Sequence, residues 1–549
     1  MLFRSFRPDE EPFGGFRDDA DAGEAMLAGV ADPDPAVRRV STEILAGLAV
    51  PDAASALMPA LDDDDPQVRA AAVRGLSRAG RDLDRLRGLL EDPDPRVRAG
   101  AAEALADEPA GRAALAAMGA DPRPEWRAAA AAARGRAGLG PGEVASALRD
   151  PEPEVRRAAA EALGSFPPKA AVGPLMEALG DPDEGARRHA SVALARIGEP
   201  ARDALVRALD RPAARSGALL ALAAAGGPPP PALRAFARDR AERAARYHRL
   251  WLRLPPGRDE RLDLLARGVR DRALAHGVDA LRAVSGSGDP EAMAVAIENL
   301  SSPDPQQRAN ALETVEAVGE PKVVRPLLVV WDAAASTDGE ETGAVADLLR
   351  DQDPWLRACA SLAAGAVDDP GLRPILAELA RDDQDEVVRQ AATVTLGDVE
   401  TLSTLSLLER VLFLSKVRLF AELPPEDLKH VAEVASEHTF PDGEVIAEQG
   451  EPGEDMHVVV SGEIRVVVGS DGGPPVEVAR RARGEYVGEM AILGQESRMA
   501  SLVCTGPVRT LSLDRRSFQR ILRERPDVSL AVMRVLSDRL REAHGDAPG

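Results

Sequence analysis

The sequence predicts an α-solenoid of short helical hairpins, followed by a small β-roll with flanking helices. Two observations carry this prediction. An Asp-Pro phrase recurs at nearly constant spacing through much of the first two-thirds of the chain, and after Asp442 the apolar residues change from helical to alternating spacing. A repeat of roughly 20–50 residues indicates stacked structural units, whereas alternation indicates strands. The chain therefore contains more than one folding unit.

The repeated phrase first appears as DPDPAVRR at Asp32 and continues to DPDEGARR at Asp181. Proline cannot continue a preceding helix and aspartate can cap the next one, so each phrase predicts the turn of a helical hairpin. An arginine stands at the same place in every copy, 29 or 31 residues from the next. We expect these arginines to bond carbonyl groups or neighbouring aspartates within the solenoid, not a ligand. They are Arg38, Arg69, Arg98, Arg127, Arg156 and Arg187.

These phrases resemble HEAT repeats of the short kind, in which DPDPxVRxxAAxAL marks the turn and the second helix. The phrase disappears after Asp210 and returns at Ser302, Asp351 and Asp382. We interpret the stretch between as diverged hairpins of one array, although the prolines at 228–231 could instead separate two sub-arrays. The predicted divisions are an N-terminal extension (1–23), HEAT-like repeats (24–212), diverged helical repeats (213–301), HEAT-like repeats (302–400), a connecting helix (401–412) and the β-roll domain (413–549).

Short Gly-bounded runs predict the strands of the β-roll: EVIAEQG, HVVVSGEIRVVVG and VRTLSLD. We expect its glycines to occupy turns in which a positive φ carries no side-chain penalty. They are Gly443, Gly450, Gly453 and Gly462. The segment from Arg515 to Ala543 predicts two helices separated by Pro526, the second of them amphipathic.

This order of features resembles the cyclic-nucleotide-binding domain shared by catabolite activator protein, protein kinase A regulatory subunits and cyclic-nucleotide-gated channels. The opening strands match in FPDGEVIAEQGEPGEDMHVVVSGEIRV. The family pattern is Phe-Gly-Glu-(Leu/Met)-Ala-Leu, a short loop and then Pro-Arg-x-Ala-(Ser/Thr), and the chain has YVGEMAILGQESRMASL. Gly488, Glu489, Arg498 and Ala500 match, which places the phosphate-binding loop between Gly488 and Ser501.

The resemblance implies a role for each matched position. Arg498 presents a planar fork of donors to the cyclic phosphate, aided by backbone amides of a short helix at 489–493. Glu489 accepts a hydrogen bond from the ribose 2′-hydroxyl, and Gly488 lets the backbone approach the sugar. Met499 and Ala500 bring main-chain amides to the phosphate. The predicted ligand-binding residues are Gly488, Glu489, Met490, Ala491, Arg498, Met499 and Ala500.

Two positions depart from the family pattern. Ser497 stands where the family usually has the proline that stiffens the loop, which predicts a reduced affinity. Met499 lacks the hydroxyl that bonds phosphate, and guanine in cGMP-selective relatives. Its presence therefore favours cAMP over cGMP as the ligand.

Composition excludes several other functions. The formal net charge of −23 argues against a nucleic-acid partner. Cys359 and Cys504 fit neither a disulfide framework nor a metal site, and no apolar stretch approaches the length of a membrane span, so we expect a cytoplasmic protein. No catalytic motif appears, and the few residues after Ala543 leave no room for a helix-turn-helix. We expect no enzymatic activity and no cofactor beyond the ligand itself.

The leading hypothesis is a sensor in which cAMP or cGMP binds the β-roll and the solenoid presents a changed surface to a protein partner. The combination also resembles the cytoplasmic tail of bacterial nucleotide (ATP/ADP) translocase-like proteins, so a membrane transporter could be that partner. A homodimer through the terminal helix is also open. One alternative is a structural adaptor with an empty β-roll, in which Glu489 and Arg498 form a solvated ion pair. Another is an enzyme built on HEAT repeats, as phycobilin lyases are, which only the shared architecture supports.

Overall fold

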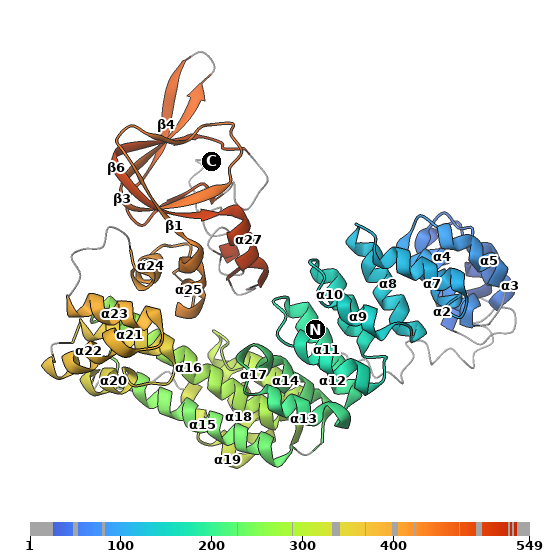
Figure 1. Cartoon of the computed structure of the whole chain (residues 1–549), viewed down its shortest axis with the longest axis horizontal. Coiled ribbons are helices and arrows are strands. Elements are labelled where there is room, and N and C mark those ends of the chain that lie inside the picture. The colour runs from blue at the N-terminus through green and yellow to red at the C-terminus, as the bar shows by residue number, and fades with distance from the viewer. Residues whose placement is uncertain are drawn as a thin grey trace. The chain divides into compact units, whose positions relative to one another are not determined.

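The computed structural model divides the chain into two compact units, Met1–Pro228 and Pro229–Gly549 (Figure 1). Their boundary falls at the first of the prolines that the sequence offers as a separator of two sub-arrays. The structure describes residues 26–47, 53–78, 83–227, 229–287, 289–331, 341–367, 369–397, 405–421, 423–470, 473–489, 497–524, 528–529 and 532–534. The predicted N-terminal extension (1–23) and most of the terminal helix after Pro526 lie outside these residues.

The first unit is a stack of helical hairpins. The second helix of each hairpin packs on the second helix of the next, in the order α2, α4, α6, α8, α10, α12 and α14. The helices are α2 (Pro35–Gly47), α3 (Ala53–Ala60), α4 (Pro66–Arg78), α5 (Leu83–Gly88), η2 (Leu89–Glu91), α6 (Pro95–Ala104), α7 (Pro109–Gly119), α8 (Pro124–Ala137), α9 (Pro141–Ala147), α10 (Pro153–Leu163), α11 (Pro168–Ala178), α12 (Glu184–Ile197), α13 (Glu199–Ala208) and α14 (Pro212–Ala225).

The Asp-Pro phrases begin the second helices, as predicted. Asp94 caps α6 by accepting the amide of Arg96 at 2.8 Å, and Asp183 caps α12 by accepting the amide of Ala186 at 2.7 Å. Small residues then let adjacent helices approach closely. A Cβ added at Gly135 on α8 would lie only 2.6 Å from the Cβ of Ala162 on α10. The alanine-rich composition therefore sets the spacing of the stack.

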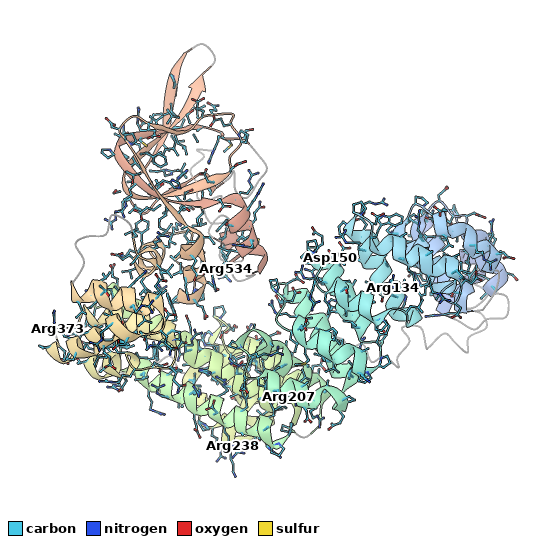
Figure 2. The ribbon with its side chains drawn as sticks, in the orientation of Figure 1. Arg134, Asp150, Arg207, Arg238, Arg373 and Arg534 are labelled. Atoms are coloured by element: carbon cyan, nitrogen blue, oxygen red, sulfur yellow. The ribbon has the colours of Figure 1, made fainter. Side chains whose placement is uncertain are left out.

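The repeated arginines link each turn to the next. Arg127 donates through Nε and Nη2 to Asp150 of the following turn at 2.7 and 2.8 Å, and through Nη1 to the carbonyls of Asp121 and Pro122 at 3.0 and 2.9 Å (Asp150 is labelled in Figure 2). The same set of bonds recurs at four other arginines, and we call the five together the arginine ladder. Its members are Arg38, Arg69, Arg127, Arg156 and Arg357. The predicted structural role of these arginines is confirmed.

The ladder changes character at α6 and α8. Arg98 donates to its own turn, at the carbonyl of Asp92, and its guanidinium lies 4.6 Å over the ring of Trp126. The carboxylate of Asp121, which would receive it in a regular step, accepts from Arg123 at 2.9 Å. The guanidinium of Arg123 also lies over the ring of Trp126, 4.2 Å from its centroid. Arg123 within the Asp-Pro phrase thus occupies Asp121, so a bond inside one turn replaces the bond from Arg98 to the next turn.

The second unit begins with more helices of the solenoid and ends with the β-roll. The long helices α15 and α16 pack against each other, and α16 also contacts α21. The helices before the β-roll are α15 (Pro231–Leu252), α16 (Glu260–Val284), η3 (Ser285–Ser287), α17 (Pro290–Asn299), α18 (Pro305–Val318), α19 (Pro321–Val324), η4 (Leu328–Trp331), α20 (Glu341–Leu348), α21 (Pro354–Ala364), η5 (Pro370–Leu372), α22 (Arg373–Asp382), α23 (Glu386–Leu396), α24 (Leu407–Leu414) and α25 (Pro425–Val434).

The β-roll is one antiparallel sheet in the order β1-β6-β3-β4, with β2 paired to β6 and β5 paired to β3. The strands are β1 (Ser436–Phe440), β2 (Val445–Ala447), β3 (Asp455–Ser470), β4 (Gly473–Arg481), β5 (Tyr486–Val487) and β6 (Ser501–Asp514). The pairing of β3 with β6 runs from Asp455 opposite Asp514 to Val467 opposite Ser501. Helix α27 (Arg515–Glu524) follows β6, and Phe518 on it meets Phe420 edge to face, with ring centroids 6.2 Å apart.

Two of the expected glycine turns differ in the structure. Gly462 has the expected positive φ of 84° but lies inside β3, where the pairing register with β6 shifts. It therefore forms an irregularity in one long strand, not a turn between two. Gly453 is not among the glycines with positive φ, whereas Gly443 and Gly450 are. Gly453 instead supplies a carbonyl that accepts from Arg515 at 2.5 Å.

Candidate functional site

The predicted loop begins where β5 ends. Gly488 has a φ of 90°, which side chains disfavour. A Cβ added there would collide with Nη1 of Arg498 and lie 3.0 Å from the carbonyl oxygen of Asp455. The glycine is therefore needed for two reasons, its backbone conformation and the close approach of the arginine to the start of β3.

The far end of the loop is held by backbone pairing. Arg498 donates its amide to the carbonyl of Glu451 at 2.8 Å and accepts from the amide of Gly450 at 2.8 Å. Ser497 beside it forms an isolated antiparallel bridge with Pro452. These bonds fix the arginine backbone even though position 497 lacks the stiffening proline of the resembling family.

The side chain of Arg498 is buried and incompletely paired. The residue is 7% exposed, and its Nη2 donates to Oδ1 of Asp455 at 2.5 Å. Its Nη1 is buried and has no hydrogen-bond partner within the part of the chain that the structure describes. A buried guanidinium N–H without an acceptor is costly, so an anion at this position would be stabilised.

Asp455 holds Arg498 from the first position of β3. Its pKa is lowered to about 2, mainly by a hydrogen bond from His457 and further by the charges of His457 and Arg498, against the opposing effect of burial. Nε2 of His457 lies 3.3 Å from Oδ2 of Asp455, and Ser512 donates to the same oxygen at 3.4 Å. The carboxylate therefore stays ionised at neutral pH and retains its pairing with Arg498.

The described members of the predicted site surround this pair. Gly488 and Glu489 follow β5, Arg498 is buried beneath Gly488, and Ala500 is half-buried just before β6. Met499 is 63% exposed. Met490 and Ala491 lie outside the described residues, as does the rest of the predicted short helix.

Sequence analysis missed the support behind Arg498. Asp455 and His457 are two residues apart on β3 and therefore share one face of the strand. Ser512 of β6 pairs opposite His457. The only sequence signal was this spacing of two along a predicted strand, which does not identify a partner more than 40 residues away.

A second cluster of charged groups joins the solenoid helices of this unit to α25. Arg272 on α16 donates to Asp353 at 2.5 Å and to Glu426 on α25 at 2.8 Å. Beside it, burial raises the pKa of Asp271 to about 6, and Oδ2 of Asp271 has no hydrogen-bond partner among the described residues. Lys429 of α25 lies over the ring of Trp355 at 5.4 Å.

The remaining reactive groups are enclosed. Cys359 and Cys504 are both buried free thiols, and burial raises the pKa of each. Within the described ranges no group of three His, Cys, Asp or Glu residues is placed to hold a metal ion. The described helices also include none that is both long and apolar enough to cross a membrane.

Comparison with known proteins identifies both halves of this architecture. The cyclic nucleotide-binding domain family matches residues 437–525, and the HEAT repeats family matches residues 23–106, 142–223 and 328–397. A cGMP-dependent protein kinase, egl-4, of Caenorhabditis briggsae is 35% identical over 112 residues, which are 20% of this chain and 15% of that kinase.

Two solved structures are each similar to about a quarter of the chain. The regulatory domain of Toxoplasma gondii PKA, co-crystallised with cAMP, is 28% identical with a TM-score of 0.23, over 25% of this chain and 50% of that one. The catabolite activator protein of Thermus thermophilus is 31% identical with a TM-score of 0.22, over 23% of this chain and 60% of that one. The chain thus carries HEAT repeats followed by a C-terminal cyclic nucleotide-binding domain, and the predicted fold class is confirmed.

Proposed function

We propose that this protein is a non-enzymatic cytoplasmic sensor that binds a cyclic nucleotide, cAMP in preference to cGMP, and couples binding to a protein partner through its HEAT solenoid. The observation that carries the proposal is the buried Nη1 of Arg498 next to Gly488, which has no hydrogen-bond partner among the described residues. A cyclic phosphate carries one negative charge and would supply the missing acceptor. The ligand preference has separate support in Met499, which offers no hydroxyl to guanine.

Coupling is supported by the contacts of α24 and α25. On one side, Phe420 after α24 meets Phe518 of α27, the helix that follows the sheet. On the other, Glu426 of α25 pairs with Arg272, and Lys416 pairs with Glu260 at the start of α16. A movement of α27 on ligand binding would therefore change the contacts that α16 makes. Different nucleotide affinities of the two arrangements would supply the coupling free energy.

The second candidate is a structural adaptor with an empty nucleotide domain, associated with a membrane transporter. This candidate predicts that Arg498 and Glu489 form a solvated ion pair. The arginine is instead buried and paired with Asp455, with one donor left over, which favours the sensor. The transporter partner and a homodimer through the terminal helix stay open as predictions.

Calorimetric titration of the full chain with cAMP and with cGMP tests the proposal. We expect tighter binding of cAMP, and loss of measurable binding in Arg498→Ala. The matched control is Arg480→Ala, because Arg480 is an exposed arginine of β4 that pairs with Glu477. Absence of heat with both nucleotides well above micromolar concentration would favour the adaptor.

Hydrogen–deuterium exchange with and without cAMP tests the coupling. We expect the nucleotide to change protection in α25 and α16, and Arg272→Gln to confine the change to α25 and the sheet. Arg243→Gln is the control, since Arg243 on α15 pairs with Asp239 of its own helix. Identical exchange of α16 in both ligand states of the native chain would contradict the coupling.

A further inference from the structure

A chain of polar groups extends from Arg498, and it is buried except at Asp455, whose side chain is 37% exposed. It runs from Arg498 to Asp455 at 2.5 Å, from Asp455 to Nε2 of His457 at 3.3 Å, and from Nδ1 of His457 to Oγ1 of Thr510 at 3.1 Å. His457 is 3% exposed and Thr510 is fully buried. The proposed function uses only Arg498 at one end of the chain and assigns no role to His457.

From this geometry we infer that His457 is a positioning residue that makes nucleotide affinity depend on pH: protonated His457 strengthens the hold of Arg498 on the cyclic phosphate. The inference rests on the proposed function, because it concerns the same site. In this inference the domain binds a proton at His457 as well as the nucleotide, and binding of one strengthens binding of the other.

The sign follows from the charges. With a neutral imidazole, the positive charge of Arg498 is balanced by Asp455, and the cluster presents little net charge to a phosphate. Protonation of His457 adds one positive charge behind Asp455 and draws on the same carboxylate, so the guanidinium is less compensated. The added charge lies on a buried side chain, while the partly exposed Asp455 lets solvent screen part of it, so we expect a moderate gain in affinity for the phosphate.

Only the imidazole changes charge in the relevant range. The pKa of Asp455 lies at about 2, so its carboxylate is ionised throughout, and a guanidinium is always protonated. A free imidazole takes up its proton near a pH of about 6.5.

Both forms of the imidazole can be accommodated without moving. Neutral His457 can donate from Nε2 to Asp455 and accept at Nδ1 from the Thr510 hydroxyl. After protonation, Nδ1 can donate to the same hydroxyl, which rotates to accept. The imidazole thus keeps a partner at each nitrogen in both forms.

The other groups around His457 leave Asp455 as its acidic partner. From β1, the ring of Phe440 meets the imidazole edge to face at 5.9 Å, with exposed His438 stacked on the far side of Phe440 at 6.2 Å. From β6 it faces the hydroxyl of Ser512, and from β5 the apolar Val487. The exposed carboxylate of Asp514 stands opposite Asp455 in the register.

The test is a titration of the full chain with cAMP between about pH 8 and about pH 5.5, the range in which imidazole titrates. We expect affinity to rise about fivefold toward acid pH, and binding at the midpoint to take up protons. Calorimetry in two buffers of different ionisation enthalpy measures that uptake. His457→Gln should bind with the same affinity at every pH and take up no proton.

The matched control is His438→Gln, because His438 is an exposed histidine of β1 whose ring stacks on Phe440. It should keep the native pH dependence. Affinity of the native chain that is independent of pH, or a pH dependence that survives in His457→Gln, would overturn the inference and leave the sensor proposal intact. Absence of binding at every pH would overturn the sensor proposal, and the inference with it. If His457→Gln fails to fold, proton uptake by the native chain decides alone.

Discussion

The arginine ladder and Arg498 use the same side chain in opposite ways. In the ladder, Arg127 directs Nε and Nη2 to the carboxylate of Asp150 and Nη1 to two carbonyls of its own turn. Arg498 is more deeply buried, yet it has one carboxylate at Nη2 and an unpaired Nη1. Burial alone therefore does not separate the two kinds of arginine, whereas the completeness of their hydrogen bonding among the described residues does.

The ladder arginines and Arg498 should respond differently to substitution. A fully paired arginine has nothing to offer a ligand, and its bonds contribute to the stability of the stack. An incompletely paired one is destabilising until an anion arrives, which is where binding free energy can come from. Substitutions should therefore separate stability from affinity.

The largest expected effect is on ligand affinity at Arg498. Arg498→Gln should weaken cAMP binding by about a hundredfold or more, roughly 3 kcal/mol, because charge-assisted bonds to the phosphate are lost. Isothermal titration calorimetry measures it. Equal loss in the exposed variant Arg480→Gln would show that general charge, not this position, is responsible.

A ladder arginine should show the reverse pattern. Arg127→Gln leaves the mostly buried Asp150 without its partner and should destabilise the α8–α10 contact by about 2 kcal/mol, with unchanged cAMP affinity. Faster hydrogen exchange in α8 and α10 would report this. A loss of affinity as large as that of the Arg498 variant would break the distinction.

Gly488→Ala tests the space that Arg498 requires. The new Cβ should displace Nη1 and weaken cAMP binding about tenfold, roughly 1.4 kcal/mol, in addition to the strain of its positive φ. The matched control is Gly484→Ala, because Gly484 has a φ of 86° with nothing within 4 Å of an added Cβ. Both variants should lose similar stability in thermal unfolding, and only the first should lose affinity.

The smallest effect concerns acid stability. The pKa of Asp455 is lowered to about 2, below the value of about 3.9 in an unfolded chain. A lowered carboxylate pKa stabilises the fold above the unfolded value, and this contribution disappears as the pH falls from about 4 toward 2. Since the Asp455 side chain is 37% exposed, we expect only about 1 kcal/mol.

Urea unfolding of the β-roll at several acid pH values measures this contribution. The pH dependence should be shallower in Asp455→Asn than in the native chain. An identical dependence in both would mean that Asp455 is not held by Arg498 and His457 in solution.

Much of the fold was predictable because it is encoded locally. Each Asp-Pro phrase contains its own turn, and phrases such as those at α6 and α12 also contain a helix cap, so the hairpins follow from residues close in sequence. The long β3 was less accessible. Gly462 resembles a turn residue in sequence, whereas pairing with β6 on both sides keeps the strand continuous through it.

The site divides in the same way. Gly488 and Arg498 stand within one loop and were predicted from its resemblance to the family pattern. Asp455 and His457 meet Arg498 and Ser512 only because β3 pairs with β6 in one register, which no local pattern specifies. The predicted roles of Glu489, Met499 and Ala500 remain predictions that a bound nucleotide would test.

The altered step at Trp126 has a mechanical consequence. In a regular step, a two-pronged Arg–Asp bond resists bending between successive hairpins. Between α6 and α8 that clamp is replaced by cation–π contacts of Arg98 and Arg123 with the indole ring of Trp126, which tolerate sliding. We expect bending compliance to concentrate there, so that a load on the first hairpins flexes the solenoid at Trp126 before it strains the repeats on either side.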